Sequence, residues 1–206
     1  AALGAVPRAH GRDVADEALL ATYAGHEAGL EAGPYLRYRE VLARACRGVC
    51  ADLGIEPSAE EVTAFAGSVG DWPAFPDSVA ALAALATRFR LAVITNCDDD
   101  LFAASNRRLG VTFDWIITAQ QAGSYKPSHR NFELAFERIG ASRDAILHVA
   151  QSLYHDHVPA KELGLRTVWI NRRGDRPGSG ATPPANASPD ATFPDMASFA
   201  EDALRA

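Results

Sequence analysis

The sequence has 206 residues, of which 48% are hydrophobic and 22% are charged. This balance is typical of one α/β domain with a modest insertion, and a chain of this length can bury its core without disulfides or a structural metal. The formal net charge of −6 at pH 7 argues against a protein that binds the phosphate backbone of nucleic acid, because such a protein needs a basic face.

Cysteine usage and hydropathy bound the compartment. Cys46 and Cys50 are four residues apart in a helical pattern, and with Cys97 they are interpreted as small apolar residues of a reducing compartment rather than as zinc ligands. No stretch reaches the roughly 20 apolar residues of a membrane span, and no basic segment precedes an apolar run as in a signal peptide. The cytoplasm is therefore the default expectation, with no membrane partner.

The first third of the chain has the pattern of helices. Residues 14–31 are rich in Ala, Leu and Glu, and apolar residues near 3.6-residue spacing predict a second helix over residues 38–53. Ser58 and Glu61 form a capping box that opens a third helix. We therefore predict an all-helical domain over residues 1–75.

Strands and helices alternate in the rest of the chain. Short apolar strands are predicted at residues 91–95, 115–118, 146–150 and 167–170. Helices are predicted after Asp77, which is placed to cap the first of them, and at residues 99–109, 129–139, 158–163 and 196–204. Continuously apolar strands joined by helices are typical of a parallel sheet that is covered on both faces. This predicts an α/β core over residues 76–206, in which residues 172–194 form a long surface loop.

Polar side chains follow the strands of this predicted sheet. Thr95 and Asn96 end the first strand, Lys126 lies beyond the second, and Asp156 follows the third. Taken singly, such residues are usually turn, surface or helix-capping residues. Because ligands bind at the carboxyl ends of strands in an open parallel sheet, we expect the hydroxyl, the ammonium and the carboxylate to converge there. Such a group suits an anionic small molecule, whose charge the lysine neutralises while the carboxylate orients the lysine, a metal or a water.

Other polar runs have ordinary structural explanations. His155 and His157 would point to different sides of a helix and would not share a metal, and His148 lies inside an apolar strand as a core or pocket-edge histidine. The acidic run at residues 98–100 suits the positive end of a helix dipole. The chain has no glycine-rich phosphate loop, and Ser152 lacks the strand-turn-helix context of a serine nucleophile.

The strand-end motifs resemble those of the haloacid dehalogenase (HAD) superfamily. The runs Ile94-Thr95-Asn96, Tyr125-Lys126-Pro127 and His148 to Asp156 look like its second, third and fourth motifs. The similarity is closest to the group named 2-haloacid dehalogenase type II, and it covers nearly the whole chain. The resemblance implies a Rossmann-like core with a helical cap near the N-terminus. It also implies a hydrolase in which an aspartate forms an ester or an acyl phosphate that water then hydrolyses.

The resemblance also assigns roles to the matching residues. It implies that Thr95 binds the anionic end or the leaving group of the substrate and that Asn96 lines the same pocket. Lys126 is the cation that neutralises the attacking carboxylate. Asp156 is the acid that orients Lys126 or a metal-bound or hydrolytic water.

The fourth motif departs from that of the magnesium phosphatases in this superfamily. Gln151 stands where they usually have an aspartate ligand, and Mg²⁺ prefers carboxylate oxygens. We therefore expect no cofactor and no metal ligands, with Mg²⁺ as the alternative. Gln151, Ser152 and Tyr154 are the remaining candidates for binding substrate, although Ser152-Leu153 replaces a Ser-Asn pair of the family.

The nucleophilic aspartate of this superfamily ends the first strand, ahead of the cap. In this sequence the helical pattern begins almost at once, and Asp13 and Asp16 look like charges at a helix N-terminus. We expect a strand and a turn of about ten to twenty residues upstream, which carry the nucleophile. That strand belongs in the middle of the sheet, because its neighbours would otherwise lack backbone partners.

Three functions stay open on the sequence. Ala24 and Phe132 stand where proven dehalogenases of this type have an arginine and a tyrosine. The leading hypothesis is a hydrolase of a small anionic substrate, with a 2-haloacid as the first choice. The alternatives are a phosphatase of a small phosphorylated metabolite and a protein of the same fold that binds small carboxylates without turnover. A homodimer is compatible with all three.

Overall fold

The computed structural model describes residues 2–176 and 178–205. Contacts divide the chain into two compact units, which are described separately. Residues 2–72 and 178–184 form a helical unit, and residues 73–176 and 185–205 form an α/β unit. The sequence predicts the boundary after residue 75 and places the segment 178–184 in the α/β domain. By its contacts that segment groups with the helical unit.

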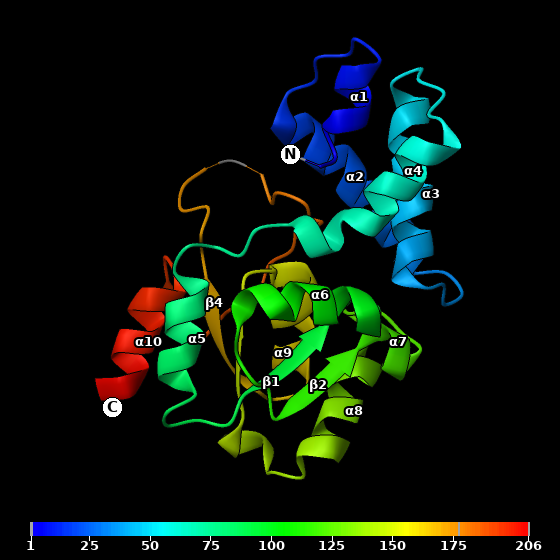
Figure 1. Ribbon diagram of the computed structural model, residues 1–206. Helices are drawn as coiled ribbons and strands as arrows, with labels where there is room; N and C mark the ends of the chain where they lie inside the picture. Colours follow the sequence, from blue (N-terminus) through cyan, green and yellow to red (C-terminus); the bar gives the residue numbers. More distant parts are fainter. Residues whose placement is uncertain (1, 177, 206) are drawn as a thin grey trace. The chain divides into compact units, whose positions relative to one another are not determined.

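The helical unit is built on three helices that pack in sequence order. Its elements are α1 (Ala5–Ala9), α2 (Asp16–Glu31), α3 (Tyr38–Asp52), α4 (Ala59–Gly67) and the 3₁₀ turn η1 (Ser68–Asp71) (Figure 1). α3 contacts both α2 and α4, and its buried face includes Cys46 and Cys50 as free thiols. Both hydrogen bonds of the capping box predicted at Ser58 and Glu61 are present, which explains where α4 begins.

The α/β unit confirms the predicted fold class. Its helices are α5 (Ser78–Leu85), α6 (Asp99–Leu109), α7 (Ala119–Ala122), α8 (His129–Ile139), α9 (Val158–Glu162) and α10 (Met196–Arg205). Its strands are β1 (Ala92–Thr95), β2 (Trp115–Thr118), β3 (Leu147–Ala150), β4 (Arg166–Ile170) and β5 (Ala191–Phe193). The short turns η2 (Arg143–Ala145) and η3 (Leu153–His157) flank β3. The helices α6 and α8 end at Gly110 and Gly140, whose left-handed backbone (φ 62° and 66°) favours glycine.

All strand pairs are parallel, but they form two sheets rather than one. β1 pairs with β2, with Thr95 opposite Thr118. The other sheet has the order β3-β4-β5, and Ala150 lies opposite Trp169. Among the described residues no strand pairs with the second edge of β1 or of β3. The single sheet predicted from the sequence is therefore divided between these edges, and the expectation of a further middle strand stays a prediction.

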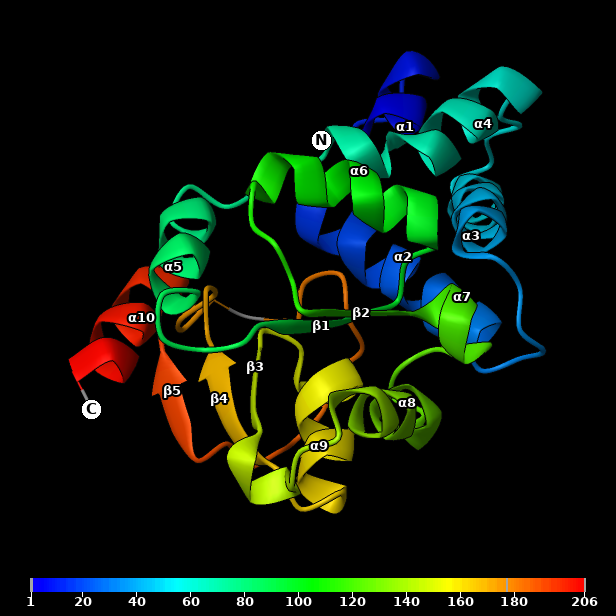
Figure 2. The ribbon, with the colours of Figure 1, turned by 60° about the horizontal axis from the view of Figure 1, so that its bottom comes forward.

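Helices cover both faces of the β1–β2 sheet. α6 lies on one side of these strands and α8 on the other, as the rotated view shows (Figure 2). Ile117 of β2 is fully buried and packs against Leu134 and Ala135 of α8. This packing fixes the loop between α7 and α8, in which Lys126 lies.

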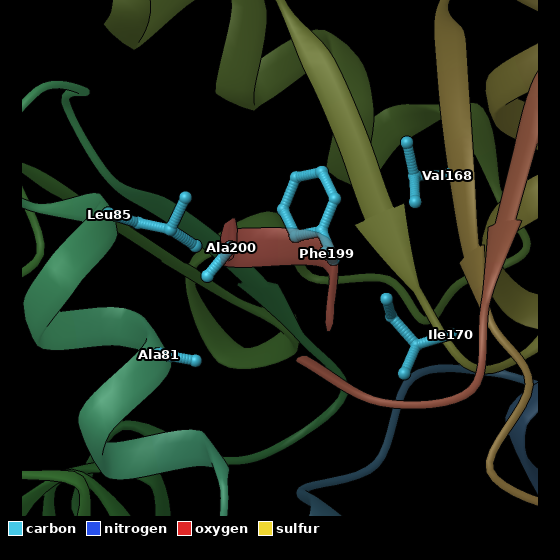
Figure 3. Close-up of a cluster of buried hydrophobic side chains, with 6 residues drawn as sticks. All are labelled: Ala81, Leu85, Val168, Ile170, Phe199 and Ala200. Carbon is cyan, nitrogen blue, oxygen red and sulfur yellow. The ribbon is translucent and has the colours of Figure 1, made fainter. Parts of the chain in front are cut away.

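A second core lies between β4, α5 and α10. Figure 3 shows Val168 and Ile170 of β4 close to Phe199 of α10. The ring of Phe193 in β5 lies 5.7 Å from that of Phe199. Burying side chains of this size stabilises the fold by about 1.5–3 kcal/mol each. The prediction that residues 172–194 form only a loop is therefore wrong for β5, which is too short to produce an alternating pattern.

Asp77 also differs from its predicted role. It precedes α5, but its side chain makes no capping hydrogen bond to that helix. Its carboxylate instead accepts hydrogen bonds from Arg172 and from the backbone N–H of Met196. The guanidinium donates to both oxygens of the carboxylate, so these long-range partners hold the side chain.

Within the described part of the chain, no helix combines the length and the apolar character that a membrane crossing requires.

Candidate active site

Lys126 and Asp156 meet at the carboxyl end of β1. The Lys126 Nζ atom donates to the carbonyl oxygen of Ile94 at 3.0 Å and to Oδ1 of Asp156 at 2.7 Å. The two side chains are only 11% and 9% exposed. A buried ammonium needs such partners, because an unpaired charge is costly to remove from water.

Asn96 explains how the loop that carries Lys126 is held. Its Oδ1 accepts the backbone N–H of Lys126 at 2.8 Å, and its Nδ2 donates to the Lys126 carbonyl at 3.1 Å. The amide therefore clamps the loop to the end of β1 by two hydrogen bonds. These contacts make Asn96 a support for the lysine, and the expectation that it lines the substrate pocket stays a prediction.

Thr95 is the last residue of β1 and follows Ile94, whose carbonyl oxygen accepts the hydrogen bond from Lys126 Nζ. Its Oγ1 accepts the backbone N–H of Cys97 at 3.3 Å. No hydrogen bond joins Thr95 to Lys126 or Asp156 among the described residues. Thr95 therefore ends β1 and Asp156 follows β3, and of the three predicted catalytic residues Lys126 and Asp156 are in direct contact.

Asp156 lies on η3, a single π-helical turn directly after β3. Ser152 begins this turn, because its Oγ accepts the N–H of His155 at 3.0 Å and its carbonyl accepts the N–H of Asp156 at 3.2 Å. Ser152 is predicted to bind substrate, but its hydroxyl caps the turn that presents Asp156. A π turn has no simple sequence pattern, so this geometry is not predictable from the motif alone.

His148 is a residue of this site for which the sequence predicts only a core or pocket-edge histidine. Its Nε2 lies 3.0 Å from Oδ1 of Asp156, the same oxygen that Lys126 contacts. Burial raises the pKa of Asp156, but the charge of Lys126 and the hydrogen bond with His148 outweigh burial and hold that pKa well below its ordinary value. Because an ionised carboxylate can only accept, Nε2 of His148 must carry the proton. A polar ring inside an apolar strand requires such a partner, and this requirement is the signal that could have identified the contact.

The two other predicted substrate-binding residues make no hydrogen bond to this pair in the described part of the chain. Gln151 is exposed, and its carbonyl accepts from the Trp169 indole at 2.9 Å. Tyr154 is half-buried, and its ring lies edge-on to that of His155 at 4.9 Å. Their proposed contacts with substrate stay predictions.

The side chains around Lys126 offer few of the oxygen ligands that Mg²⁺ prefers. Among the described residues, Asp156 is the one carboxylate that contacts Lys126, and its Oδ1 already accepts from Lys126 and His148. No group of three or more His, Cys, Asp or Glu side chains that could hold a metal occurs in the part of the chain described here. Mg²⁺ requires an octahedral set of oxygen ligands, usually with one or two carboxylates. In the described part of the chain these residues thus supply one of the carboxylates that Mg²⁺ would need, and the expectation of no cofactor stays a prediction.

A hollow of about 460 Å³ lies elsewhere in the α/β unit, beside α6 and β2. Asp99 is its acidic residue, but its Oδ1 already accepts from Thr118 at 2.6 Å and from Gln121 at 2.8 Å. None of the predicted site residues lines the hollow. The hollow is therefore separate from the contact between Lys126 and Asp156.

Comparisons with known proteins agree with the motifs. The family model of haloacid dehalogenase-like hydrolases matches residues 8–156. The haloacetate dehalogenase H-2 of Moraxella sp. (strain B) is 30% identical over 145 residues, which are 69% of this chain and 64% of the relative. The (S)-2-haloacid dehalogenase of Pseudomonas sp. (strain YL) is 28% identical over 144 residues, with 68% and 62% covered. The chain thus spans less than two thirds of the length of these relatives.

The fold has close counterparts among solved structures. The L-2-haloacid dehalogenase of Xanthobacter autotrophicus superposes with a TM-score of 0.83 at 20% identity, over 98% of this chain and 91% of that one. At this identity the likeness establishes the fold alone. The family model covers most of the chain and includes Thr95, Lys126 and Asp156. The chain therefore belongs to the family of haloacid dehalogenase-like hydrolases.

Proposed function

We propose that the protein is a hydrolase of small anionic molecules, with 2-haloacids as the leading substrate class, and that it acts through an aspartyl intermediate. One observation carries the proposal. Oδ1 of the buried Asp156 carboxylate accepts hydrogen bonds from both Lys126 and His148. Its Oδ2 has no hydrogen-bond partner among the described residues. A held carboxylate with one free acceptor can orient a water beside a fixed ammonium. The similarity to a haloacetate dehalogenase and to an (S)-2-haloacid dehalogenase favours a halogenated acid.

Lys126 supplies the positive charge of the proposed reaction. At an effective dielectric constant near 20, an anion about 4 Å away gains about 4 kcal/mol before its desolvation is subtracted. In the described part of the chain no carboxylate other than Asp156 contacts Lys126. The proposed attacking aspartate is therefore a residue other than those that contact Lys126 in the described part of the chain.

In the proposed first step, the attacking carboxylate forms a C–O bond to the carbon that bears the halogen. The C–X bond breaks, and the halide leaves with the electron pair. Water then adds to the acyl carbon of the ester, which releases the 2-hydroxy acid, restores the carboxylate and gives one proton to solvent. Because the pKa of Asp156 is held well below its ordinary value, this carboxylate is a weak base. It therefore orients the water by accepting a hydrogen bond and does not store the proton.

The test uses the full-length protein and two substrate panels, 2-halocarboxylates and phosphate esters, each with and without Mg²⁺. We expect halide release without added metal. Lys126→Ala should lower kcat/KM at least about 100-fold to 1000-fold, the usual effect of losing one electrostatic stabiliser. The matched control is Lys161→Ala, which removes an exposed lysine paired with Asp190 and should leave the rate unchanged.

Three outcomes would contradict the proposal. Mg²⁺-dependent release of phosphate without release of halide would identify a phosphatase. Saturable binding of small carboxylates without turnover would identify a binding protein. Full activity of Lys126→Ala would remove Lys126 from the reaction.

A further inference from the structure

We propose that His148 is a positioning residue of this site: together with Lys126 it holds Oδ1 of Asp156, and so it presents Oδ2 to the hydrolytic water. The part of the inference that concerns water rests on the proposed function. The part that concerns the carboxylate does not, because it can be measured without substrate.

Two hydrogen-bond donors contact the same oxygen, Oδ1, of Asp156. Oδ1 accepts from Lys126 Nζ at 2.7 Å and from His148 Nε2 at 3.0 Å. The two donors come from different elements, the loop before α8 and the strand β3. Rotation of the carboxylate would break both hydrogen bonds at once. Oδ2 is thus left as the acceptor of a side chain that is only 9% exposed.

The surroundings of His148 favour this role. Its ring packs against Phe132, with ring centroids 5.3 Å apart, and the side chain is 13% exposed. Among the described residues its Nε2 contacts Asp156, whose Oδ1 also accepts from Lys126, and the ring centroid of His157 lies 6.4 Å away.

His157 does not compete for the carboxylate. Its Nε2 donates to the carbonyl of Ala150 at 3.0 Å, and its buried Nδ1 has no hydrogen-bond partner among the described residues. Burial lowers the pKa of His157, so its ring is neutral at pH 7. His148 is therefore the histidine that contacts Asp156.

A purely structural role for His148 makes a different prediction from a positioning role. If His148 only fills space beside Phe132, a phenylalanine should replace it without a change at Asp156. If its N–H holds Oδ1, a glutamine should preserve part of the effect, because its amide N–H can lie near the position of Nε2. The variants His148→Phe and His148→Gln therefore separate shape from hydrogen bonding.

The first measurement follows the Asp156 carboxylate by ¹³C NMR during an acid titration, with ¹⁵N NMR of the His148 ring. We expect the Nε2–H tautomer in the wild type. The midpoint for Asp156 should rise by about one pH unit or more in His148→Phe, the size expected for the loss of one charge-assisted hydrogen bond. The rise should be smaller in His148→Gln. His129→Phe is the matched control, because His129 contacts Glu162 at 2.8 Å on the exposed surface. An Asp156 midpoint that His148→Phe leaves unchanged, or an Nδ1–H tautomer, would overturn the proposal.

The second measurement is a single turnover of a 2-halocarboxylate, with the covalent ester followed by mass spectrometry. In His148→Phe we expect ester hydrolysis to slow about tenfold to a hundredfold while ester formation keeps its rate, so that the intermediate accumulates. His148→Gln should restore part of the rate. Equal effects on both steps, or on neither, would overturn the role in water positioning. Absence of an ester in the wild type would instead reject the proposed function, and the NMR titration would still decide whether His148 positions Asp156.

Discussion

Two cation–carboxylate pairs of the α/β unit differ in how the carboxylate is used. In the pair of Arg172 and Asp77, the guanidinium donates to Oδ1 at 2.9 Å and to Oδ2 at 3.0 Å. The backbone N–H of Met196 donates to Oδ2 as well, at 2.7 Å. Both oxygens of Asp77 are therefore occupied, and the pair ties the start of α5 to the end of β4 and to the start of α10.

The pair of Lys126 and Asp156 is arranged differently. Lys126 and His148 both contact Oδ1, and Oδ2 has no hydrogen-bond partner among the described residues. The carboxyl pKa is nevertheless lowered in both pairs. For Asp77 the hydrogen bond from Arg172 is the main cause. For Asp156 burial opposes the decrease, and Lys126 and His148 outweigh burial. A lowered pKa is therefore common to both carboxylates, and the open acceptor at Asp156 is the feature that differs between them.

The largest effect on stability is expected at the pair of Lys126 and Asp156. Lys126→Met should lower the free energy of unfolding at pH 7 by about 3–5 kcal/mol, because it leaves Asp156 ionised and buried without its cation. Urea unfolding measures the change. Lys161→Met is the control, since its exposed pair with Asp190 should contribute only about 0–1 kcal/mol. Equal losses for the two variants would show that Lys126 is not effectively buried.

Removing the cation from the pair of Arg172 and Asp77 should lower the free energy of unfolding by less. Arg172→Met should cost about 1–3 kcal/mol, because Asp77 keeps the hydrogen bond from Met196 and is 18% exposed. Arg205→Met is the control, since Arg205 is 78% exposed in its pair with Glu201. A loss larger than that of Lys126→Met would reverse the comparison between the two pairs.

The acid dependence of stability should separate the pairs further. A carboxyl whose pKa is lowered on folding stabilises the protein fully above its ordinary pKa, and this contribution is lost as the pH falls through the folded value. The ordinary value is 3.8 for both groups, so the loss should begin near pH 4. As the pH falls below about 4, the wild type should lose about 1–2 kcal/mol more of its unfolding free energy than Asp156→Asn does. The corresponding difference for Asp77→Asn should be smaller. Equal slopes for the two variants would show that the surroundings of the two carboxyls do not differ in this way.

Much of the α/β unit could be predicted because local signals agree there. α6, α8 and β2 have the bounds that the apolar patterns and the terminal glycines predict. The sequence also predicts that Lys126 and Asp156 converge, because both follow strands whose carboxyl ends are expected at one side of an open parallel sheet.

The features that sequence reasoning missed depend on distant partners or on subtle backbone geometry. Asp77 contacts Arg172, a residue 95 positions later, and no local pattern distinguishes that contact from a helix cap. The π turn η3 presents Asp156, although the same residues have the pattern of an ordinary helix start. The sequence predicts a core or pocket-edge histidine at His148, because its neighbours in β3 are apolar, whereas its contact with Asp156 depends on that turn.

The smallest effect on stability is expected from the aromatic ring beside the pair of Arg172 and Asp77. The Arg172 guanidinium lies over Phe75, 4.1 Å from the ring centroid, and Phe75 is 58% exposed. Little apolar burial is at stake, so Phe75→Leu should cost about 0.5–1 kcal/mol through the lost cation–π contact. A double-mutant cycle with Arg172→Met measures this coupling. Phe89→Leu is the control, because Phe89 is 43% exposed and its arginine, Arg88, is farther away at 5.7 Å. A coupling near zero would mean that hydrogen bonds alone orient the guanidinium, and the occupancy of the carboxylate oxygens would then be the main difference between the two pairs.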